Sequence, residues 1–136
     1  MKATGQCVCG AVRVEVATLS PNVGACHCGT CRRWGGGPLM AVDAGTDVQI
    51  EGEVTIYDSS EWPERGFCGT CGTHLFYRLK ASQQHVMAAG LFGKPEEFVF
   101  DHQVFIDEKP HFYSFAGETK DMTGPELFAS FAESAG

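Results

Sequence analysis

The chain has 136 residues and a mass of 14.7 kDa, which is the size of one ordinary domain and enough to build a hydrophobic core. Hydrophobic residues make up 43% of the sequence and charged residues 20%, a balance that excludes a disordered or collagen-like chain. The net charge is −7 with no run of basic residues, which disfavours a nucleic-acid-binding protein because phosphate binding needs clustered Lys and Arg.

The predicted elements, taken in chain order, are mostly short strands. Val12, Val14 and Val16 alternate with polar residues, which is the pattern of a half-buried strand. Glycines and prolines separate the later extended runs, as expected of turns between the strands of a sheet. These runs are Leu39–Asp43, Asp47–Glu51, Val54–Asp58, Thr73–Leu79, His85–Ala89 and Phe98–Ile106.

Helices are predicted at few places. The segment Pro125–Ala132 has apolar residues at helical spacing and a proline at an early position, which indicates a short C-terminal helix. Single helical turns are expected after Cys31 and at Pro95. The sequence therefore predicts one domain over residues 1–136, mainly β and antiparallel, with short helices.

Neither a membrane span nor a signal peptide is visible in the sequence. No segment approaches the roughly 18 apolar residues of a spanning helix, and the first residues lack the apolar stretch of a secretory leader. We therefore expect a cytoplasmic protein with no membrane partner. Its seven cysteines are then expected to stay reduced, and an odd number could not pair completely in disulfides.

The cysteines have the spacing of metal ligands. A C-x-C pair on an extended strand places both side chains on one face, and a C-x2-C turn lets both sulfurs reach one ion. Soft thiolates in tetrahedral sets of four select zinc. The three groups are Cys7 and Cys9, then Cys26, Cys28 and Cys31, then Cys68 and Cys71.

The spacing divides the seven cysteines into four and three. The trio, Cys26, Cys28 and Cys31, lies within one short stretch of the chain. The two distant pairs then form the quartet, which consists of Cys7, Cys9, Cys68 and Cys71. Four ligands make a closed structural site, whereas three leave one position for water or a substrate. We therefore predict two Zn²⁺ per chain, one structural at the quartet and one catalytic at the trio.

Other interpretations of these residues stay open at this point. A histidine could complete the trio as a second structural site, with His74 a better candidate than His27, because the cysteines beside His27 would point to the opposite face. Cys28 and Cys31 could instead form a redox dithiol, although no βαβ pattern of a thioredoxin-like fold is evident.

Three cysteine motifs and one later stretch follow each other in a specific order. They are Cys7-Val-Cys9-Gly10, Cys26-His27-Cys28-Gly29-Thr30-Cys31-Arg32, Phe67-Cys68-Gly69-Thr70-Cys71-Gly72-Thr73 and Val104–Pro110. This order resembles the glutathione-dependent formaldehyde-activating enzyme family, of the centromere-protein-V-like zinc-binding β-tent group. The resemblance implies a zinc-stapled β-tent fold with structural zinc at the quartet and catalytic zinc at the trio. It also implies a carbon–sulfur lyase that adds a thiol reversibly to an aldehyde, as glutathione adds to formaldehyde to give S-hydroxymethylglutathione.

Two basic residues after the trio are candidates for substrate binding. Glutathione is an anion and needs a positive spot on a protein of net charge −7. Arg32 and Arg33 directly follow Cys31, and guanidinium groups clamp carboxylates. An alternative of equal weight is that they only offset the negative charge of the zinc–thiolate cluster or solvate the surface.

Three kinds of function fit these observations. The first is an enzyme that adds glutathione or a similar small thiol to formaldehyde or another small aldehyde. The second is a non-catalytic zinc-stapled binding module, and the third is a thiol redox or zinc-buffering protein. The open position at the trio favours the enzyme.

Overall fold

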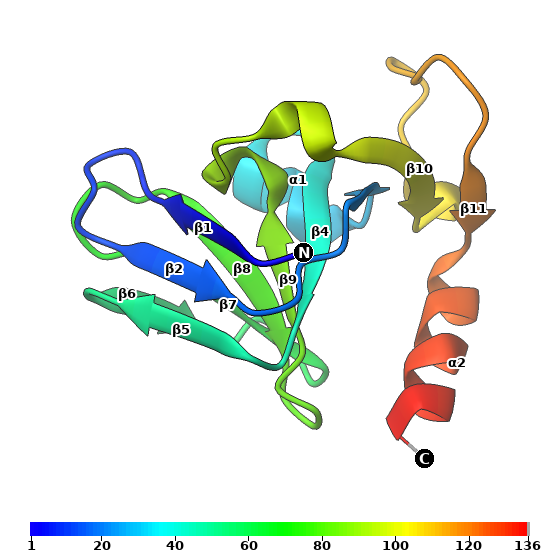
Figure 1. Ribbon diagram of the computed structural model, residues 1–136. Coiled ribbons are helices and arrows are strands. Elements are labelled where there is room, and N and C mark those ends of the chain that lie inside the picture. Colours follow the sequence, from blue (N-terminus) through cyan, green and yellow to red (C-terminus); the bar gives the residue numbers. More distant parts are fainter. Residues whose placement is uncertain (136) are drawn as a thin grey trace.

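Short strands dominate residues 1–135, the part of the chain that the computed structural model describes (Figure 1). Their bounds are β1 (Ala3–Gln6), β2 (Arg13–Val16), β3 (Asn22–Cys26), β4 (Leu39–Gly45), β5 (Val48–Glu51), β6 (Val54–Tyr57), β7 (Pro63–Cys68), β8 (His74–Leu79), β9 (His85–Ala88), β10 (Val99–Val104) and β11 (Lys120–Met122). A small sheet has the order β1-β2-β5, and a larger sheet has the order β11-β10-β3-β4-β9-β8-β7-β6. The mainly β architecture expected from the sequence is confirmed.

Every strand predicted from patterning is present, with its ends shifted by at most about two residues. The strands β1, β3, β7 and β11 were not predicted. In β3 the four residues Val23–Cys26 are all buried, so the strand lacks the alternation by which a one-sided strand is recognised. In β7 the register shifts at Gly66, and this irregularity also hides the period of two.

Most strand pairs are antiparallel, and the exceptions surround β10. This strand pairs in parallel with both β3 and β11. Parallel neighbours need a long connection, and the segment 105–119 supplies it between β10 and β11. The antiparallel arrangement expected from the sequence therefore holds for the rest of the two sheets but not at this edge.

The helices are short. They are α1 (Gly29–Gly35), α2 (Gly124–Ala135) and the 3-10 turns η1 (Ala89–Leu91), η2 (Pro95–Glu97) and η3 (Ile106–Glu108). The expected turn after Cys31 is in fact α1, which begins before this residue because Cys28 caps its N-terminus. Gly36, with φ of 88°, ends α1 in the left-handed conformation that glycine adopts easily. Within residues 1–135, neither α-helix has the length and apolar character needed to cross a membrane.

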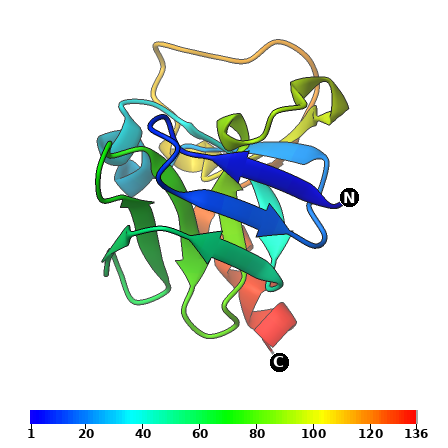
Figure 2. The ribbon, with the colours of Figure 1, turned by 60° about the vertical axis from the view of Figure 1, so that its left-hand side comes forward.

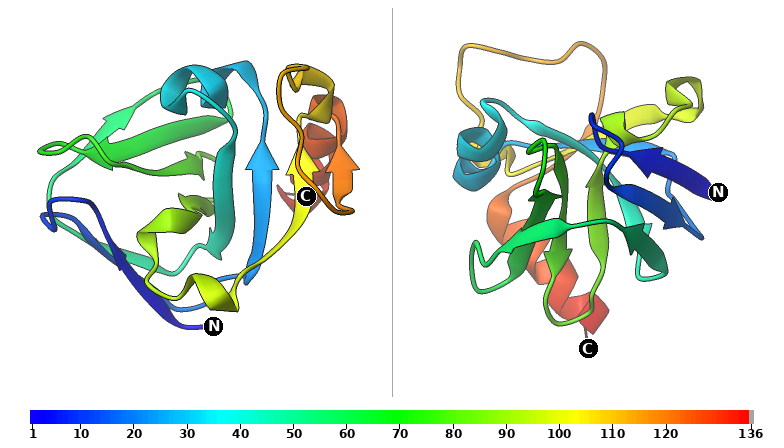
Figure 3. Two further views of the ribbon diagram at one scale, coloured as in Figure 1. Left: turned by 90° about the horizontal axis from the view of Figure 1, so that it is seen from above. Right: turned by 90° about the vertical axis from the view of Figure 1, so that its left-hand side faces the viewer.

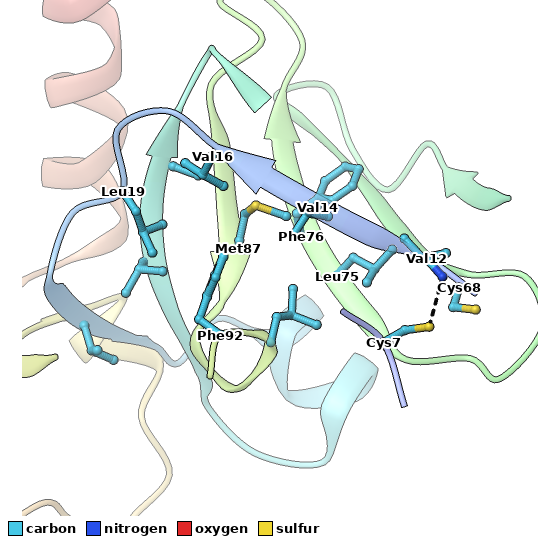
Figure 4. Packing of buried hydrophobic residues seen from close by; sticks show 14 residues of the cluster. Cys7, Val12, Val14, Val16, Leu19, Cys68, Leu75, Phe76, Met87 and Phe92 are labelled. Carbon is cyan, nitrogen blue, oxygen red and sulfur yellow. Dashed lines mark hydrogen bonds between the residues drawn. The ribbon is translucent and has the colours of Figure 1, made fainter. Parts of the chain in front are cut away.

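The hydrophobic core lies between the two sheets. Figure 2 shows the small sheet in front of the larger one, and Figure 4 shows Val14 and Val16 of β2 beside Phe76 and Met87 of the larger sheet. These four side chains are almost fully buried. Seen from above and from the side in Figure 3, α2 lies on the other side of the larger sheet from β1 and β2. The core therefore lies on one side of the larger sheet, and the trio and α2 lie on the other side.

Candidate metal centres

The quartet lies where two turns from distant parts of the chain meet. Cys7 and Cys9 follow β1, whereas Cys68 ends β7 and Cys71 follows it. The four Sγ atoms lie within 4.8 Å of one another, with 3.6 Å between Cys7 and Cys9 and 3.8 Å between Cys9 and Cys68. A tetrahedral zinc with Zn–S bonds of about 2.3 Å holds its sulfurs about 3.8 Å apart. The arrangement of these donors therefore fits zinc.

Hydrogen-bond donors already face the sulfurs of the quartet. The backbone N–H groups of Thr70 and Cys71 both donate to Cys68 Sγ at 3.4 Å. Thr73 links the two turns, because its hydroxyl accepts from the N–H of Val8 at 3.1 Å and also lies at hydrogen-bond distance, 3.1 Å, from Cys71 Sγ. The hydrogen bonds from Thr73 lower the pKa of Cys71 to about 5. These contacts thus favour the thiolate at Cys68 and at Cys71.

The trio forms on the other side of the larger sheet, at the junction of β3 and α1. Cys26 ends β3, Cys28 is the residue before α1, and Cys31 lies in the first turn of this helix. Their Sγ atoms lie within 4.8 Å of one another, and the N–H of Cys31 donates to Cys28 Sγ at 3.3 Å. Among the described residues, no fourth His, Cys, Asp or Glu side chain joins this group.

The three thiols of the trio compete for one negative charge. Hydrogen bonds from Cys26 and Cys31 lower the pKa of Cys28. Cys28 and Cys31, together with burial, raise the pKa of Cys26. A divalent cation would remove this conflict, because a coordinating thiol loses its proton. The chemistry of the three donors therefore fits a metal ion with one further position.

Arg65, on β7, is a buried cation that contacts the trio and that the sequence analysis missed. Arg65 is only 5% exposed. Both of its Nη atoms lie 3.5 Å from Cys31 Sγ. The guanidinium also lies over the ring of Trp34, 5.0 Å from its centroid, and near that of Tyr77. Among the described residues, no carboxylate forms an ion pair with Arg65. The polar group that its guanidinium contacts is Cys31 Sγ.

His27 is fully buried between two cysteines of the trio and is not directed at the metal site. Its Nε2 lies 2.8 Å from Gln103 Oε1, and its Nδ1 lies 2.7 Å from the hydroxyl of Tyr113. Gln103 Nε2 donates to Thr119 Oγ1, so its Oε1 is free to accept a proton from Nε2–H of His27. Burial lowers the pKa of His27, which keeps it neutral and leaves Nδ1 to accept from Tyr113. The ring thereby ties the trio to β10 and to the segment 105–119.

His74, the other histidine considered as a ligand, belongs to neither group of cysteines. Its ring stacks on Trp34, with 4.1 Å between the centroids and 18° between the planes. Trp34 in turn lies against Arg65, so His74 supports the wall behind the trio.

The two arginines after the trio both reach the outside of α1. A Cβ placed on Gly29 would lie 3.7 Å from Arg33 Nη1 and 3.8 Å from Arg32 Nη2. Arg32 also donates from Nε to the carbonyl of His27 at 3.0 Å. Arg33 is exposed and lines a cavity of about 360 Å³ that also borders Cys26 and Cys28. Arg33 is thus beside the cavity, while Arg32 is partly engaged with the backbone of the trio.

Comparison with known proteins gives three consistent findings. The family model described as glutathione-dependent formaldehyde-activating enzyme matches residues 2–108. A Schizosaccharomyces pombe protein described as an uncharacterized lyase is 34% identical over 132 residues, which cover 95% of this chain and 96% of that protein. The crystal structure of a Rhodobacter sphaeroides protein is 27% identical with a TM-score of 0.56, and the match covers 65% of this chain and 85% of that one.

Proposed function

Because this chain belongs to the glutathione-dependent formaldehyde-activating enzyme family, we propose that it is a zinc-dependent carbon–sulfur lyase. The reaction is the reversible addition of glutathione or a similar thiol to formaldehyde or another small aldehyde. The thiol releases its proton, the sulfur bonds to the carbonyl carbon, and the electrons of the C=O π bond move to oxygen. A proton from water then completes the S-hydroxymethyl adduct, and the lyase direction is the reverse.

The observation that carries this proposal is the difference between the two groups of cysteines. The quartet has the four sulfurs of a closed structural zinc site, whereas the trio has three and borders a cavity. We therefore assign one Zn²⁺ to each group. Zinc at the trio would take the substrate sulfur at its fourth position and keep it as the thiolate, which is the nucleophilic form.

The residues around the trio prepare the site for an anionic sulfur. The guanidinium of Arg65 lies against Cys31, so a positive charge already faces the place where a further negative charge arrives. His27 fixes the short loop that carries Cys26 and Cys28 through its bonds to Gln103 and Tyr113. We assign both residues to holding the cysteines and compensating their charge.

Arg32 and Arg33 are the residues that we assign to the carboxylates of the thiol substrate. Their guanidinium groups flank Gly29, next to Cys28. Arginine pairs with carboxylates through two parallel hydrogen bonds, which also orient the ligand. A local positive patch is what an anionic substrate needs on a protein whose net charge is −7. The reaction uses reduced thiols, so we assign the protein to the cytoplasm.

The test is the exchange rate between ¹³C-labelled formaldehyde and its glutathione adduct, measured by NMR. Three samples are compared: zinc-loaded wild type, Cys28→Ser with its zinc content determined, and buffer alone. Acceleration by wild type alone supports the proposal. No acceleration by wild type that holds two zinc ions would overturn it and leave a zinc-stapled binding module or a redox and zinc-buffering protein.

A further inference from the structure

The cavity beside the trio has two chemically different ends. One end is polar and is formed by Cys26 and Cys28 of the trio with Arg33 and Glu108. The carboxylate of Glu108 also accepts from the N–H of Gly29 at 3.1 Å. The other end is apolar and is lined by Trp62, Phe105, Leu127, Phe128 and Phe131. A polar tripeptide such as glutathione matches the first end but offers nothing to the second. The apolar end therefore needs another occupant.

Aromatic contacts hold α2 as the wall of this apolar end. The ring of Phe128 lies 5.2 Å from that of Trp62 and 5.7 Å from that of Phe105, and the ring of Phe131 lies 6.4 Å from that of Trp62. Trp62 and Phe128 still keep 38% and 37% of their surface exposed. A ligand seated here would remove this apolar surface from water, which is favourable in proportion to the area covered.

The start of α2 is fixed in place by its own local structure. Thr123 and Glu126 form a capping box, with Thr123 N–H donating to Glu126 Oε1 at 3.0 Å and Glu126 N–H donating to Thr123 Oγ1 at 3.3 Å. Gly124 N–H donates to Asp107 Oδ1 at 2.9 Å, and a Cβ on Gly124 would lie 2.6 Å from the ring of Phe105. The wall is therefore built into the fold at its N-terminal end.

The apolar wall lies largely outside the region that defines the family. The family match ends at residue 108, whereas α2 begins at Gly124 (Figure 1). The trio and the quartet belong to the matched region, so the chemistry is shared with the family. The α2 wall follows that matched region in the sequence and borders the apolar end of the cavity.

We infer that the trio site acts on aldehydes that carry an apolar substituent of several carbons, with α2 as the element that determines this specificity; the inference rests on the proposed function. The thiol is oriented by its sulfur at the trio and by the charged groups at the polar end, so the carbonyl partner takes the apolar end. Formaldehyde is hardly larger than water, which has a share of about 30 Å³ in the liquid. It would cover almost none of the apolar end of the cavity, whose total volume is about 360 Å³.

The test is a series of linear aldehydes from propanal to hexanal, whose intrinsic reactivities are similar, with glutathione as the thiol. For each aldehyde, the rate with zinc-loaded protein is divided by the rate without protein. We expect this ratio to rise about three- to fourfold per added methylene while the apolar end fills. In Phe131→Ala the rise with chain length is lost, while the acceleration with formaldehyde remains. Phe112→Ala is the matched control, because Phe112 is 74% exposed and does not line the cavity.

A second readout does not depend on activity. Linear alcohols from ethanol to hexanol serve as unreactive analogues, and their dissociation constants are followed through the methyl NMR signals of Leu127. Binding that tightens with chain length in wild type but not in Phe131→Ala supports the apolar site even if no aldehyde reacts, in which case only the proposed function fails. A flat series with both aldehydes and alcohols, beside normal acceleration with formaldehyde, would overturn the inference and leave the proposed function standing.

Discussion

Replacing Arg65 separates its effect on the metal site from its effect on folding. In Arg65→Met the two Nη contacts to Cys31 Sγ, each of 3.5 Å, are lost. Hydrogen bonds to a charged group contribute about 1.5–3 kcal/mol, and each 1.4 kcal/mol is a factor of ten. We therefore expect zinc at the trio to bind about 10- to 100-fold more weakly, while zinc at the quartet binds as before.

Apart from the stabilisation lost through weaker zinc binding at the trio, the fold itself should change little in stability. Arg65 Nε is buried without a hydrogen-bond partner among the described residues, and leaving such a group unsatisfied costs about 1–3 kcal/mol. An apolar side chain of similar shape removes this cost, so Arg65→Met is expected to keep its free energy of unfolding within about 1–2 kcal/mol of wild type. Urea unfolding of both proteins with zinc at the quartet but not at the trio measures this difference.

The assay is a competition with a chromophoric chelator, in which the two zinc ions are released at different chelator concentrations. Arg78→Met is the matched control, because Arg78 lies on β8 and pairs with Glu64 at 2.7 Å rather than with the trio. Arg65→Lys should lie between wild type and Arg65→Met, since a point charge replaces only part of a two-pronged contact. Unchanged affinity at the trio in a folded Arg65→Met protein would refute the role given to this residue.

The division of the cysteines, the bond between Tyr113 and His27, and the burial of His85 can each be tested by mutation. Cys68→Ser should unfold much of the domain, because structural zinc contributes folding energy directly, whereas Cys28→Ser should stay folded. Circular dichroism distinguishes the two variants. An unfolded Cys28→Ser protein would contradict the division into quartet and trio. Tyr113→Phe removes the hydroxyl that donates to His27 Nδ1 and should lower the free energy of unfolding by about 0.5–1.5 kcal/mol in urea titrations. An unchanged free energy of unfolding would argue against this hydrogen bond. Burial lowers the pKa of His85, so the neutral ring contributes stability that is complete above its unfolded pKa near 6.5 and is lost as the pH falls below that value. Wild type should therefore lose more stability than His85→Leu between pH 7 and pH 5, and equal losses would rule out His85 as the cause.

The sequence was sufficient to predict the parts of this protein that depend on local spacing. The alternation around Val14 predicted β2, and the motif spacing grouped the cysteines as the structure brings them together. In contrast, β3 is buried along most of its length and shows no alternation, so nothing local marks it as a strand. The parallel pairing of β10 also depends on a long connection that sequence periodicity does not describe.

Arg65 shows why part of the site could not be predicted from local sequence spacing. It is one arginine in a polar stretch, separated from Cys31 by 34 positions in the sequence. Only the pairing of β7 in the larger sheet brings its guanidinium to the trio. The search for a positive charge therefore led to Arg32 and Arg33, which adjoin Cys31 in the sequence and lie on the outside of α1. The wall formed by α2 could not be predicted for the same reason. Local spacing predicted the C-terminal helix but not the surface of the protein that this helix covers.

The central claim is that the quartet is a closed zinc site and that the trio takes the sulfur of the substrate. It is tested most directly by ¹¹³Cd NMR of protein in which cadmium replaces zinc, during a titration with glutathione. We expect two cadmium signals. Only the signal from the trio shifts toward four-sulfur coordination as the thiol binds, and this signal alone is absent in Cys28→Ser. A trio signal that already shows four sulfurs, or that does not respond to any thiol, would contradict the assignment of the trio as the site of the substrate sulfur.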